Sequence, residues 1–252
     1  MTKRFSTKTA LVTGGGSGIG RATAQAFAAE GASVVVVGRQ MEPLAQTVKL
    51  IEADGGEAVA VTADVSRAED VAAAVATAVR HYGGLDIAFN NAGVFLPGMV
   101  ADIEEADWAN GLAVNLTGVW LSMKYEIDHM RAHGGGVIVN TASNLGAHAR
   151  IPGAGGYIAT KAAVSALTRT AAREYIADGI RINAISPGPT ATSMSLRPGE
   201  TDADRAERLR TALPIGRVGT LDEITASVLW LASPECGFTV GHDLVVDGGA
   251  SA

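Results

Sequence analysis

The chain has 252 residues, of which 47% are hydrophobic, and it carries a formal net charge of −6 at pH 7. This length and apolar content suit a globular protein with a large buried core and exclude a disordered chain. The 20 basic residues are outnumbered by 26 acidic ones and are scattered along the chain, which argues against nucleic acid or an anionic membrane surface as the partner.

The cysteine count and the first residues bear on where the protein works. Cys236 is the only cysteine, so an internal disulfide and a cysteine-built metal site are both excluded. The opening MTKRFSTKTALVTGGG lacks the apolar core of a signal peptide, and no stretch is long enough to span a bilayer. The five histidines show no zinc-binding spacing, and no metal site is predicted. We therefore expect a cytoplasmic protein.

Seven short runs rich in β-branched residues predict strands. The run from Val34 to Val37 is continuously apolar, which is typical of a strand buried on both faces of a parallel sheet. The predicted strands cover residues 10–13, 33–38, 58–62, 86–89, 136–143, 181–186 and 243–249.

Alanine-rich segments between these strands have the period of amphipathic helices. Within residues 67–84 a stripe of Val71, Val75, Val79 and Tyr82 precedes a Gly-Gly pair that ends the pattern. Strands and helices that alternate in this way predict an α/β fold, a Rossmann-type doubly wound parallel sheet of seven strands with helices on both faces. Because no linker or repeat divides the chain, we expect residues 1–252 to form a single domain.

The first predicted strand is followed by TGGGSGIG, in which Gly14, Gly18 and Gly20 open a helical segment. Glycines permit a tight turn and a close backbone approach, and the free N–H groups of the helix start attract a pyrophosphate. The alternative is an ordinary glycine-rich turn, and the spacing is one residue wider than the usual dinucleotide fingerprint. The place of this turn after the first strand favours dinucleotide binding.

The second predicted strand ends at Gly38 and Arg39, where NAD-binding folds carry an acid for the adenosine ribose hydroxyls. An arginine there favours NADP, because a charge-assisted contact to the 2′-phosphate is worth about 1.5 to 3 kcal/mol. A solvated arginine, or one stacked on adenine, is the alternative, and it leaves NAD possible.

Polar residues also follow the third and fourth predicted strands. Asp64 can accept the adenine amino group or simply mark a helix start. The segment from Asn90 to Gly93 can line the adenosine or form an Asn/Gly turn. Both positions are where a doubly wound sheet binds its ligand.

Tyr157 and Lys161 lie four residues apart in GGYIATKAAV, on one face of a predicted helix. An unperturbed tyrosine has a pKa of about 10, which is too high for a general base near neutral pH. A lysine ammonium about 4 Å away would lower that pKa by about three units. The alternative is an amphipathic helix whose tyrosine and lysine reach solvent.

Ser143 at the end of the fifth strand and Asn115 in AVNLTG complete a set that resembles the short-chain dehydrogenase/reductase family. The motifs TGGGSGIG, ADVS, NNAG, VNLTG, NTAS, YIATK, INAISPGPTAT and VVDGG occur in the family's order over nearly the whole chain. The resemblance implies an NAD(P)-binding oxidoreductase that transfers hydride between the nicotinamide and a secondary alcohol or ketone.

The resemblance also implies a role for each residue. Tyr157 would be the catalytic acid/base, and Lys161 its pKa-lowering partner and a ligand of the nicotinamide ribose. Ser143 would orient the substrate oxygen, and Asn115 would help to hold a water for proton relay. Two hydroxyls that converge on one oxygen stabilise the charge change there. The cofactor would contact Gly14, Ser17, Gly18, Ile19, Gly20, Arg39, Asp64, Val65, Asn91, Ala92, Gly93, Tyr157, Lys161, Pro187, Gly188, Thr190 and Thr192.

Two features depart from the family's pattern. Ser143 and Tyr157 are one residue further apart than is common, and we expect the extra residue to bulge in a loop that holds His148 and Arg150. Such a bulge would alter the substrate pocket. Ser17 stands where many NADP-using members have a basic residue, which leaves Arg39 alone to select the cofactor.

The substrate is open at this point. Residues 193–213 are charged and partly helical in pattern, which suits a mobile lid with Met194 and Leu196 on its inner face. Such a pocket fits a 3-oxoacyl thioester, a cyclic ketone, a sugar or a steroid alike. The family resemblance implies a homotetramer, with residues 221–233 and the last strand as contact surfaces. A dinucleotide-binding redox sensor without turnover is the alternative, although a sensor has no need of a lowered phenol pKa.

Overall fold

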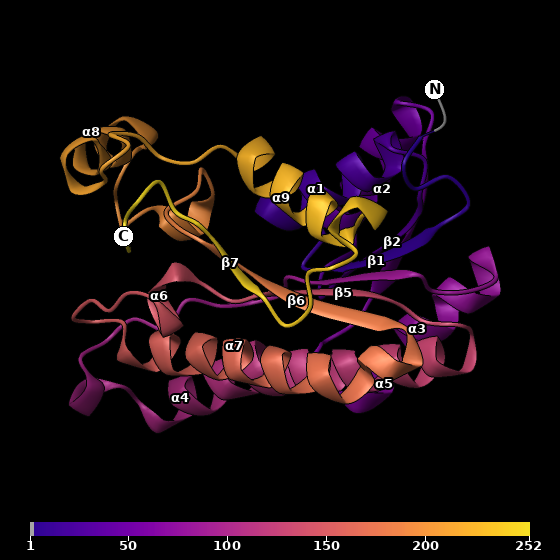
Figure 1. The fold of residues 1–252 in the computed structure, drawn as a ribbon. Helices are drawn as coiled ribbons and strands as arrows, with labels where there is room; N and C mark the ends of the chain where they lie inside the picture. The colour runs from indigo at the N-terminus through magenta and orange to yellow at the C-terminus, as the bar shows by residue number, and fades with distance from the viewer. Residues whose placement is uncertain (1–2) are drawn as a thin grey trace.

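The seven predicted strands all form, and they join in one parallel sheet with the order β3-β2-β1-β4-β5-β6-β7 (Figure 1). The computed structural model describes residues 3–252. The winding reverses between β1 and β4, which is where doubly wound sheets bind ligands. The strands are β1 (Thr9–Thr13), β2 (Ser33–Gly38), β3 (Glu57–Thr62), β4 (Ile87–Asn90), β5 (Gly136–Thr141), β6 (Ile180–Pro187) and β7 (Asp243–Val246).

Helices cover both faces of the sheet, as predicted (Figure 1). One face carries α1 (Gly18–Ala29), α2 (Met41–Ala53) and α9 (Leu221–Ala232). The other face carries α3 (Ala68–Tyr82), α4 (Glu105–Leu112), α5 (Gly118–Ala132) and α7 (Gly155–Tyr175). The short α6 (Asn144–Ala147) and the helix α8 (Asp202–Ala212) lie at the carboxyl ends of the strands, at the left of the view.

The apolar stripe predicted for α3 is confirmed in its first half. Val75 is buried in the core against the sheet and Val71 in a small cluster with Val65, whereas Val79 and Tyr82 are half-buried. The helix ends where Gly83 adopts a left-handed backbone with φ of 85°, a conformation that costs glycine little. The pattern of β-branched and glycine residues thus fixes both the packed face and the end of this helix.

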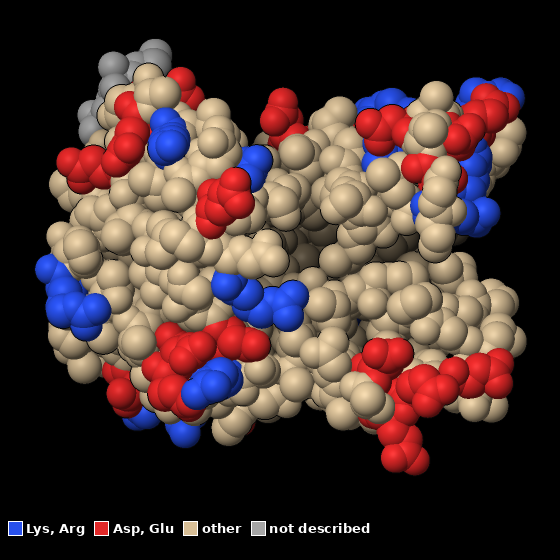
Figure 2. Space-filling view, turned by 180° about the vertical axis from the view of Figure 1, so that it is seen from behind, with Lys and Arg blue, Asp and Glu red and all other residues tan. Residues whose placement is uncertain are grey.

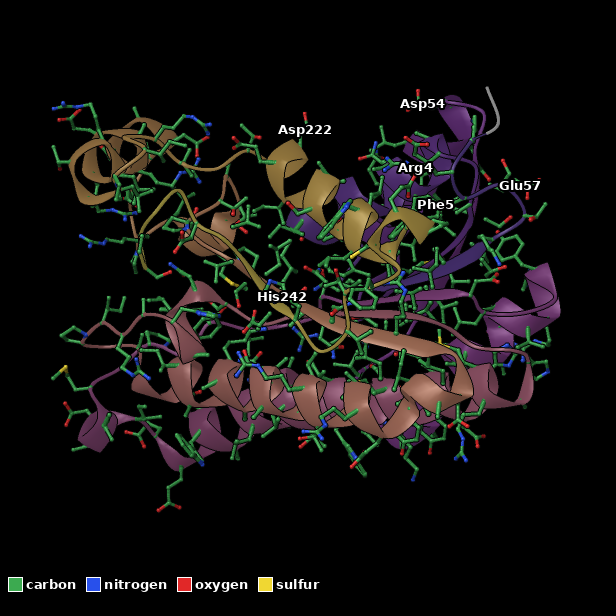
Figure 3. All side chains as sticks on the ribbon, viewed as in Figure 1. Arg4, Phe5, Asp54, Glu57, Asp222 and His242 are labelled. Carbon is green, nitrogen blue, oxygen red and sulfur yellow. The ribbon has the colours of Figure 1, made fainter. Side chains whose placement is uncertain are left out.

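The sheet separates two apolar cores. Val34 and Val36 of β2 pack into the core under α1 and α9, whereas Val35 and Val37 pack into the core under α3, α5 and α7. This alternation confirms that β2 is buried on both faces. The N-terminal segment joins the first core through Phe5, which packs edge-on against the α1 side chain Phe27 with ring centroids 5.1 Å apart (Figure 3).

The last strand is held at its start by a backbone contact. The amide of His242, just before β7, donates to Oδ1 of Asn183 in β6 at 2.9 Å (Figure 3). Seen from behind, a hollow opens between the charged α8 segment and the body beneath it, and its visible walls carry few charged side chains (Figure 2). No helix within residues 3–252 is long and apolar enough to cross a membrane.

Candidate active site

The glycine turn after β1 has no room for side chains. Gly14 and Gly18 have φ of 66° and 51°, a region that favours glycine. A Cβ on Gly20 would lie 2.2 Å from the carbonyl oxygen of Gly14, and one on Gly18 would lie 3.2 Å from Cγ2 of Thr192. A backbone this closely packed at the start of α1 fits the pyrophosphate of a dinucleotide. The side chain of Ile19 packs partly on the core beneath the turn.

The segment after β4 is tied to this turn. The Thr13 hydroxyl accepts hydrogen bonds from the backbone amides of Asn91 and Ala92 at 3.0 and 3.1 Å. Nδ2 of Asn91 donates to the carbonyl oxygen of Thr13 at 3.2 Å. Gly93 lies between two predicted catalytic side chains, because a Cβ there would be 3.3 Å from Oδ1 of Asn115 and 3.5 Å from Nζ of Lys161.

Arg39 and Asp64 lie near each other at the ends of β2 and β3. Oδ1 of Asp64 accepts from the backbone amide and the hydroxyl of Ser66 at 2.9 and 2.7 Å. These hydrogen bonds, and then the charge of Arg39, lower the pKa of Asp64. Arg39 is exposed, whereas the neighbouring Val65 side chain is buried under α5.

Asn115 sits in a π-helical turn, Ala113–Thr117, between α4 and α5. Such turns are rare and occur frequently at functional sites. Oδ1 of Asn115 accepts from the amide of Val94 at 2.8 Å, while Nδ2 donates to the Val94 carbonyl and the Thr160 hydroxyl. The side chain therefore clamps the loop after β4 to α7.

Lys161 is 2% exposed, and its Nζ donates to the carbonyl oxygen of Thr141 at 2.7 Å. Burial lowers its pKa to about 8, which leaves the amine mainly protonated at neutral pH. Its Nζ lies 5.8 Å from the ring centroid of Tyr157. The structure therefore places a buried cation beside the tyrosine.

Tyr157 is buried, with 8% of its surface exposed, and Ser143 is 6% exposed. Burial raises the pKa of the Tyr157 phenol, and a hydrogen bond with the Ser143 side chain lowers it in part. The sequence predicts that Lys161 lowers this pKa, but the chain's own groups raise it. The cost of desolvating the phenolate outweighs the groups that would lower the pKa. The predicted meeting of Ser143, Tyr157 and Lys161 does take place.

The loop between Ser143 and Tyr157, where the sequence predicts a bulge, is closed by a short backbone contact. The amide of Ala149 donates to the Asn144 carbonyl at 2.7 Å. His148 does not line a pocket, since its Nε2 lies 3.0 Å from Oδ2 of the buried Asp243 in β7. This contact anchors the loop to the sheet.

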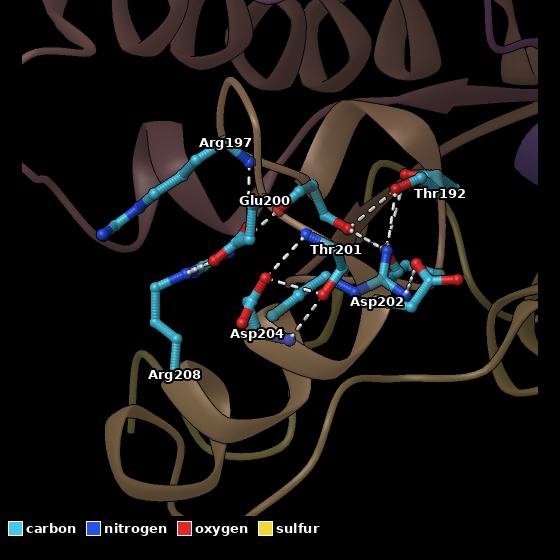
Figure 4. A network of polar contacts seen from close by, with 10 residues as sticks. Thr192, Arg197, Glu200, Thr201, Asp202, Asp204 and Arg208 are labelled. Carbon is cyan, nitrogen blue, oxygen red and sulfur yellow. Dashed lines mark hydrogen bonds and ion pairs between the residues drawn. The ribbon is translucent and has the colours of Figure 1, made fainter.

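Polar contacts join residues 193–213, the predicted lid, to one another and to Thr192 in the segment after β6 (Figure 4). The side chain of Arg205 in α8 is buried and donates to the carbonyl of Thr192 at 3.0 Å. Arg208 binds both carboxylate oxygens of Glu200 at 2.6 and 2.7 Å. The predicted partial helicity of residues 193–213 is confirmed by α8, and Met194 is 48% exposed.

The segment after β6 runs close to the glycine turn, where a Cβ on Gly18 would lie 3.2 Å from Cγ2 of Thr192. Gly188 packs against Asp247, where a Cβ would lie 2.6 Å from the Asp247 Cβ. The hydroxyl of the buried Thr190 donates to the Gly188 carbonyl at 3.0 Å. Pro187 ends β6, and the N-cap of α1, Ser17, makes no side-chain cap.

Sequence reasoning did not single out three contributors to the site. Thr13 holds the segment after β4, the Thr141 carbonyl holds Lys161, and the Phe95 ring lies 5.1 Å from the Tyr157 ring. Phe95 is the second residue after the NNAG segment, and this position is the one signal that could have found it. Within residues 3–252, no group of three or more His, Cys, Asp or Glu side chains is placed to hold a metal ion.

Comparisons with known proteins agree with this geometry. A family model described as "Enoyl-(Acyl carrier protein) reductase" matches residues 14–251. The chain is 42% identical to a cyclohexanol dehydrogenase of Acinetobacter sp. (strain SE19), covering 98% of this chain and 96% of that one. It is 41% identical to a 2,5-dichloro-2,5-cyclohexadiene-1,4-diol dehydrogenase of Sphingobium indicum, covering 98% of each.

A solved structure carries the same fold. The crystal structure of a short-chain type dehydrogenase/reductase from Mycobacterium marinum superposes with a TM-score of 0.93 at 34% identity, covering 100% of this chain and 98% of that one. Enzymes of this type use NAD or NADP as the hydride carrier. Because the family model and these relatives match nearly the whole chain, which also carries the glycine turn and the buried tyrosine and lysine, the chain belongs to the short-chain dehydrogenase/reductase family and is an NAD(P)-dependent oxidoreductase of the alcohol dehydrogenase type.

Proposed function

We propose that this enzyme oxidises secondary alcohols on six-membered carbon rings, or reduces the corresponding ketones, with Tyr157 as the acid/base. The observation that carries the proposal is the buried Tyr157 hydroxyl beside Ser143, with the Phe95 ring against its own ring. Two relatives at 42% and 41% identity are named for alcohols of cyclohexane-type rings.

Exposed apolar side chains support a ring substrate. Phe95, Ile151 and Met194 follow the carboxyl ends of β4, β5 and β6, and they are 41%, 49% and 48% exposed. Apolar walls with a few convergent hydroxyls are typical of small-molecule sites. A cyclic alcohol would bury its ring carbons against these walls and direct its oxygen toward Tyr157 and Ser143.

The chain's own residues handle the proton. When bound, the dinucleotide supplies the hydride acceptor or donor. In oxidation the Tyr157 phenolic oxygen takes the proton of the substrate hydroxyl, and in reduction it returns a proton to the carbonyl oxygen. The Ser143 hydroxyl orients that oxygen, and the protonated Lys161 amine favours the phenolate. Because its pKa is raised, the phenol of the chain alone holds its proton at neutral pH, the state that ketone reduction needs.

We assign NADP as the favoured cofactor, with NAD possible. Arg39 follows β2 and acts electrostatically on Asp64, so its guanidinium lies at the edge where an adenosine ribose would sit. Three sets of contacts remain predictions. They are the contacts of Asp64 and Val65 with adenine, of Asn115 with a relay water, and of Ser17, Pro187, Thr190 and Thr192 with the cofactor.

Turnover tests this function. Purified enzyme with NADP+ and cyclohexanol, and with NADPH and cyclohexanone, is followed by the absorbance of the reduced nicotinamide. We expect turnover in both directions and a loss of about a thousandfold in kcat for Tyr157→Phe. Tyr175→Phe, at the far end of the same helix, is the matched control and should retain the wild-type rate.

Three outcomes would speak against the proposal. If Tyr157→Phe keeps the wild-type kcat, the acid/base assignment is wrong. The family description names an acyl-carrier-protein reductase, so an acetoacetyl thioester is assayed in parallel. Turnover of the thioester alone would move the substrate class to 3-oxoacyl thioesters, and cofactor binding without any turnover would favour a redox sensor.

We also propose a homotetramer. Trp230 on α9 is 41% exposed, and Phe238, just before β7, is fully exposed. Exposed aromatic side chains of this size are enriched at protein interfaces. Light scattering after gel filtration measures the mass directly, and a mass near 25.7 kDa would contradict the assembly. The cytoplasmic location stays a prediction.

A further inference from the structure

Glu126 is a fully buried carboxyl group on α5 that the proposed chemistry does not use. Its Oε2 accepts a hydrogen bond from Nδ2 of Asn90 at 2.9 Å. No lysine, arginine or histidine forms an ion pair with it among the described residues. A carboxylate without a cation at such depth would cost several kcal/mol.

Glu126 is one end of a chain of buried amides and hydroxyls. Nδ2 of Asn90 in β4 also donates to Oδ1 of Asn140 in β5 at 3.0 Å. Nδ2 of Asn140 donates in turn to the Thr168 hydroxyl of α7 at 2.9 Å, and also contacts the sulfur of Met123. All of these side chains except that of Met123 have no measurable exposure or 1% exposure.

The elements joined by this network are those that carry the site. The turn that holds Asn115 leads into α5, and β4 leads into the segment Asn91–Gly93. Strand β5 ends just before Ser143, and α7 carries both Tyr157 and Lys161. A network that fixes α5, β4, β5 and α7 relative to one another therefore fixes the four side chains to which the proposed chemistry assigns a role.

Two buried oxygens of the network lack a donor. Oε1 of Glu126 and Oδ1 of Asn90 have no hydrogen-bond partner. Both are acceptors if Glu126 is ionised, whereas a proton on the carboxyl supplies the missing donor. Beside Glu126 lies a cavity of about 10 Å³, close to the space that one water needs.

The surroundings of Glu126 favour the neutral form from every side. The cavity is lined from β1, β2 and α3 by apolar side chains and by the hydroxyl residues Thr13 and Ser122, and no other titratable group faces it. Burial raises the pKa of Glu126 to about 8, and the Asn90 hydrogen bond opposes this only in part.

We propose that Glu126 is a positioning residue of this active site, held as a neutral carboxylic acid whose hydrogen bond with Asn90 begins the network that keeps α5, β4, β5 and α7 in register. The proposal rests on the function assigned above to the four catalytic side chains. Ionisation of Glu126 would place an uncompensated charge at the centre of the network, and its contacts would loosen.

Activity tests the positioning role with three variants. Glu126→Gln is neutral, keeps the shape and retains an acceptor for Asn90, and it should lower kcat less than threefold at pH 7. Glu126→Met keeps the volume but removes the hydrogen bond, and it should lower kcat about tenfold or more with KM for NADP within twofold. Glu105→Gln, on the exposed start of α4, is the control and should match the wild type.

The pH profile separates positioning from mere packing. Above pH 8 the wild-type kcat should fall relative to that of Glu126→Gln, because only the wild type can ionise there. A full kcat for Glu126→Met, or a loss for Glu126→Gln as large as that for Glu126→Met, would overturn the positioning role.

The protonation state is measured without any turnover, so its outcome is independent of the proposed function. The infrared spectrum at pH 7 should contain the C=O band of a buried carboxylic acid that Glu126→Gln lacks. Between pH 4.5 and about 8 the native state holds a proton that the unfolded chain has released, so the free energy of unfolding should fall as pH rises. An absent band, or an equal pH dependence in Glu126→Gln, would overturn the neutral assignment.

Discussion

The two faces of the sheet are packed in different ways. Under α1 and α9 the packed side chains are mostly apolar, and within residues 3–252 the one hydrogen bond between buried polar side chains of these two helices joins the hydroxyls of Thr23 and Thr225 at 3.5 Å. Under α5 and α7 the core holds Glu126, Asn140 and Lys161, each with at most 2% exposure. Polar burial is thus concentrated on one side of the sheet.

The difference follows from what each face must hold. The glycine turn that enters α1 would bind the dinucleotide with backbone groups, and a backbone turn can rest on an apolar core. The residues proposed for catalysis on α7 would act through side chains, which must be buried and fixed in position. Burial of that kind lowers stability, which is a common property of active sites. The apolar face therefore raises the free energy of unfolding, whereas the buried polar groups of the other face lower it.

Of the variants considered, Lys161→Met should have the largest effect, because it removes a buried charge from the polar face. Methionine has a similar shape and no charge, so it removes the desolvation of the buried amine, whose pKa is lowered to about 8. We expect kcat to fall about a thousandfold and the free energy of unfolding at pH 7 to rise by about 2 kcal/mol, after the loss of the bond to Thr141. Steady-state kinetics and urea unfolding measure the two effects.

The sign of the pH effect gives an independent check on Lys161. Between pH 8 and the usual lysine pKa near 10.5, the unfolded chain binds a proton that the native state has released. The stability of the wild type should therefore rise with pH over this range, and that of Lys161→Met should not. A variant that is both inactive and less stable at pH 7 would contradict the comparison of the two faces.

Gly20→Ala tests the apolar face, where one substitution should weaken both cofactor binding and the stability of the fold. The new Cβ would meet the Gly14 carbonyl at 2.2 Å, and a backbone atom cannot move aside as a side chain can. We expect the dissociation constant for NADP to rise about a hundredfold and stability to fall by about 2 kcal/mol. Fluorescence titration and thermal unfolding measure these changes.

The control for this variant is another glycine with free space around it. Gly84 has only Nε2 of His129 near its missing Cβ, at 3.8 Å, and its φ is not positive. Gly84→Ala should leave the dissociation constant and the melting temperature close to wild type. If Gly20→Ala binds NADP as the wild type does, the close packing of the turn is not what shapes the cofactor site.

The sequence predicts local features better than contacts between distant elements, for a physical reason. The apolar run Val34–Val37 predicts a strand buried on both faces, and the glycines after β1 predict a tight turn; both of these local features form. Glu126 reads as one polar residue in an amphipathic helix, since its burial depends on β4 and β5, which pair only in three dimensions. The pKa of Tyr157 differs from the prediction for the same reason, because desolvation is a property of the whole site.

Arg39→Ala has the smallest expected effect, because it acts at the rim of the site, away from both cores. Removal of a guanidinium contact worth about 1.5 to 3 kcal/mol should lower the preference for NADP over NAD by about one to two decades. The ratio of kcat/KM for the two cofactors measures this, and stability should not change. Arg67→Ala is the matched control, since Arg67 also acts electrostatically on Asp64 but is engaged by Glu69. An unchanged ratio in Arg39→Ala would mean that Arg39 does not select the cofactor.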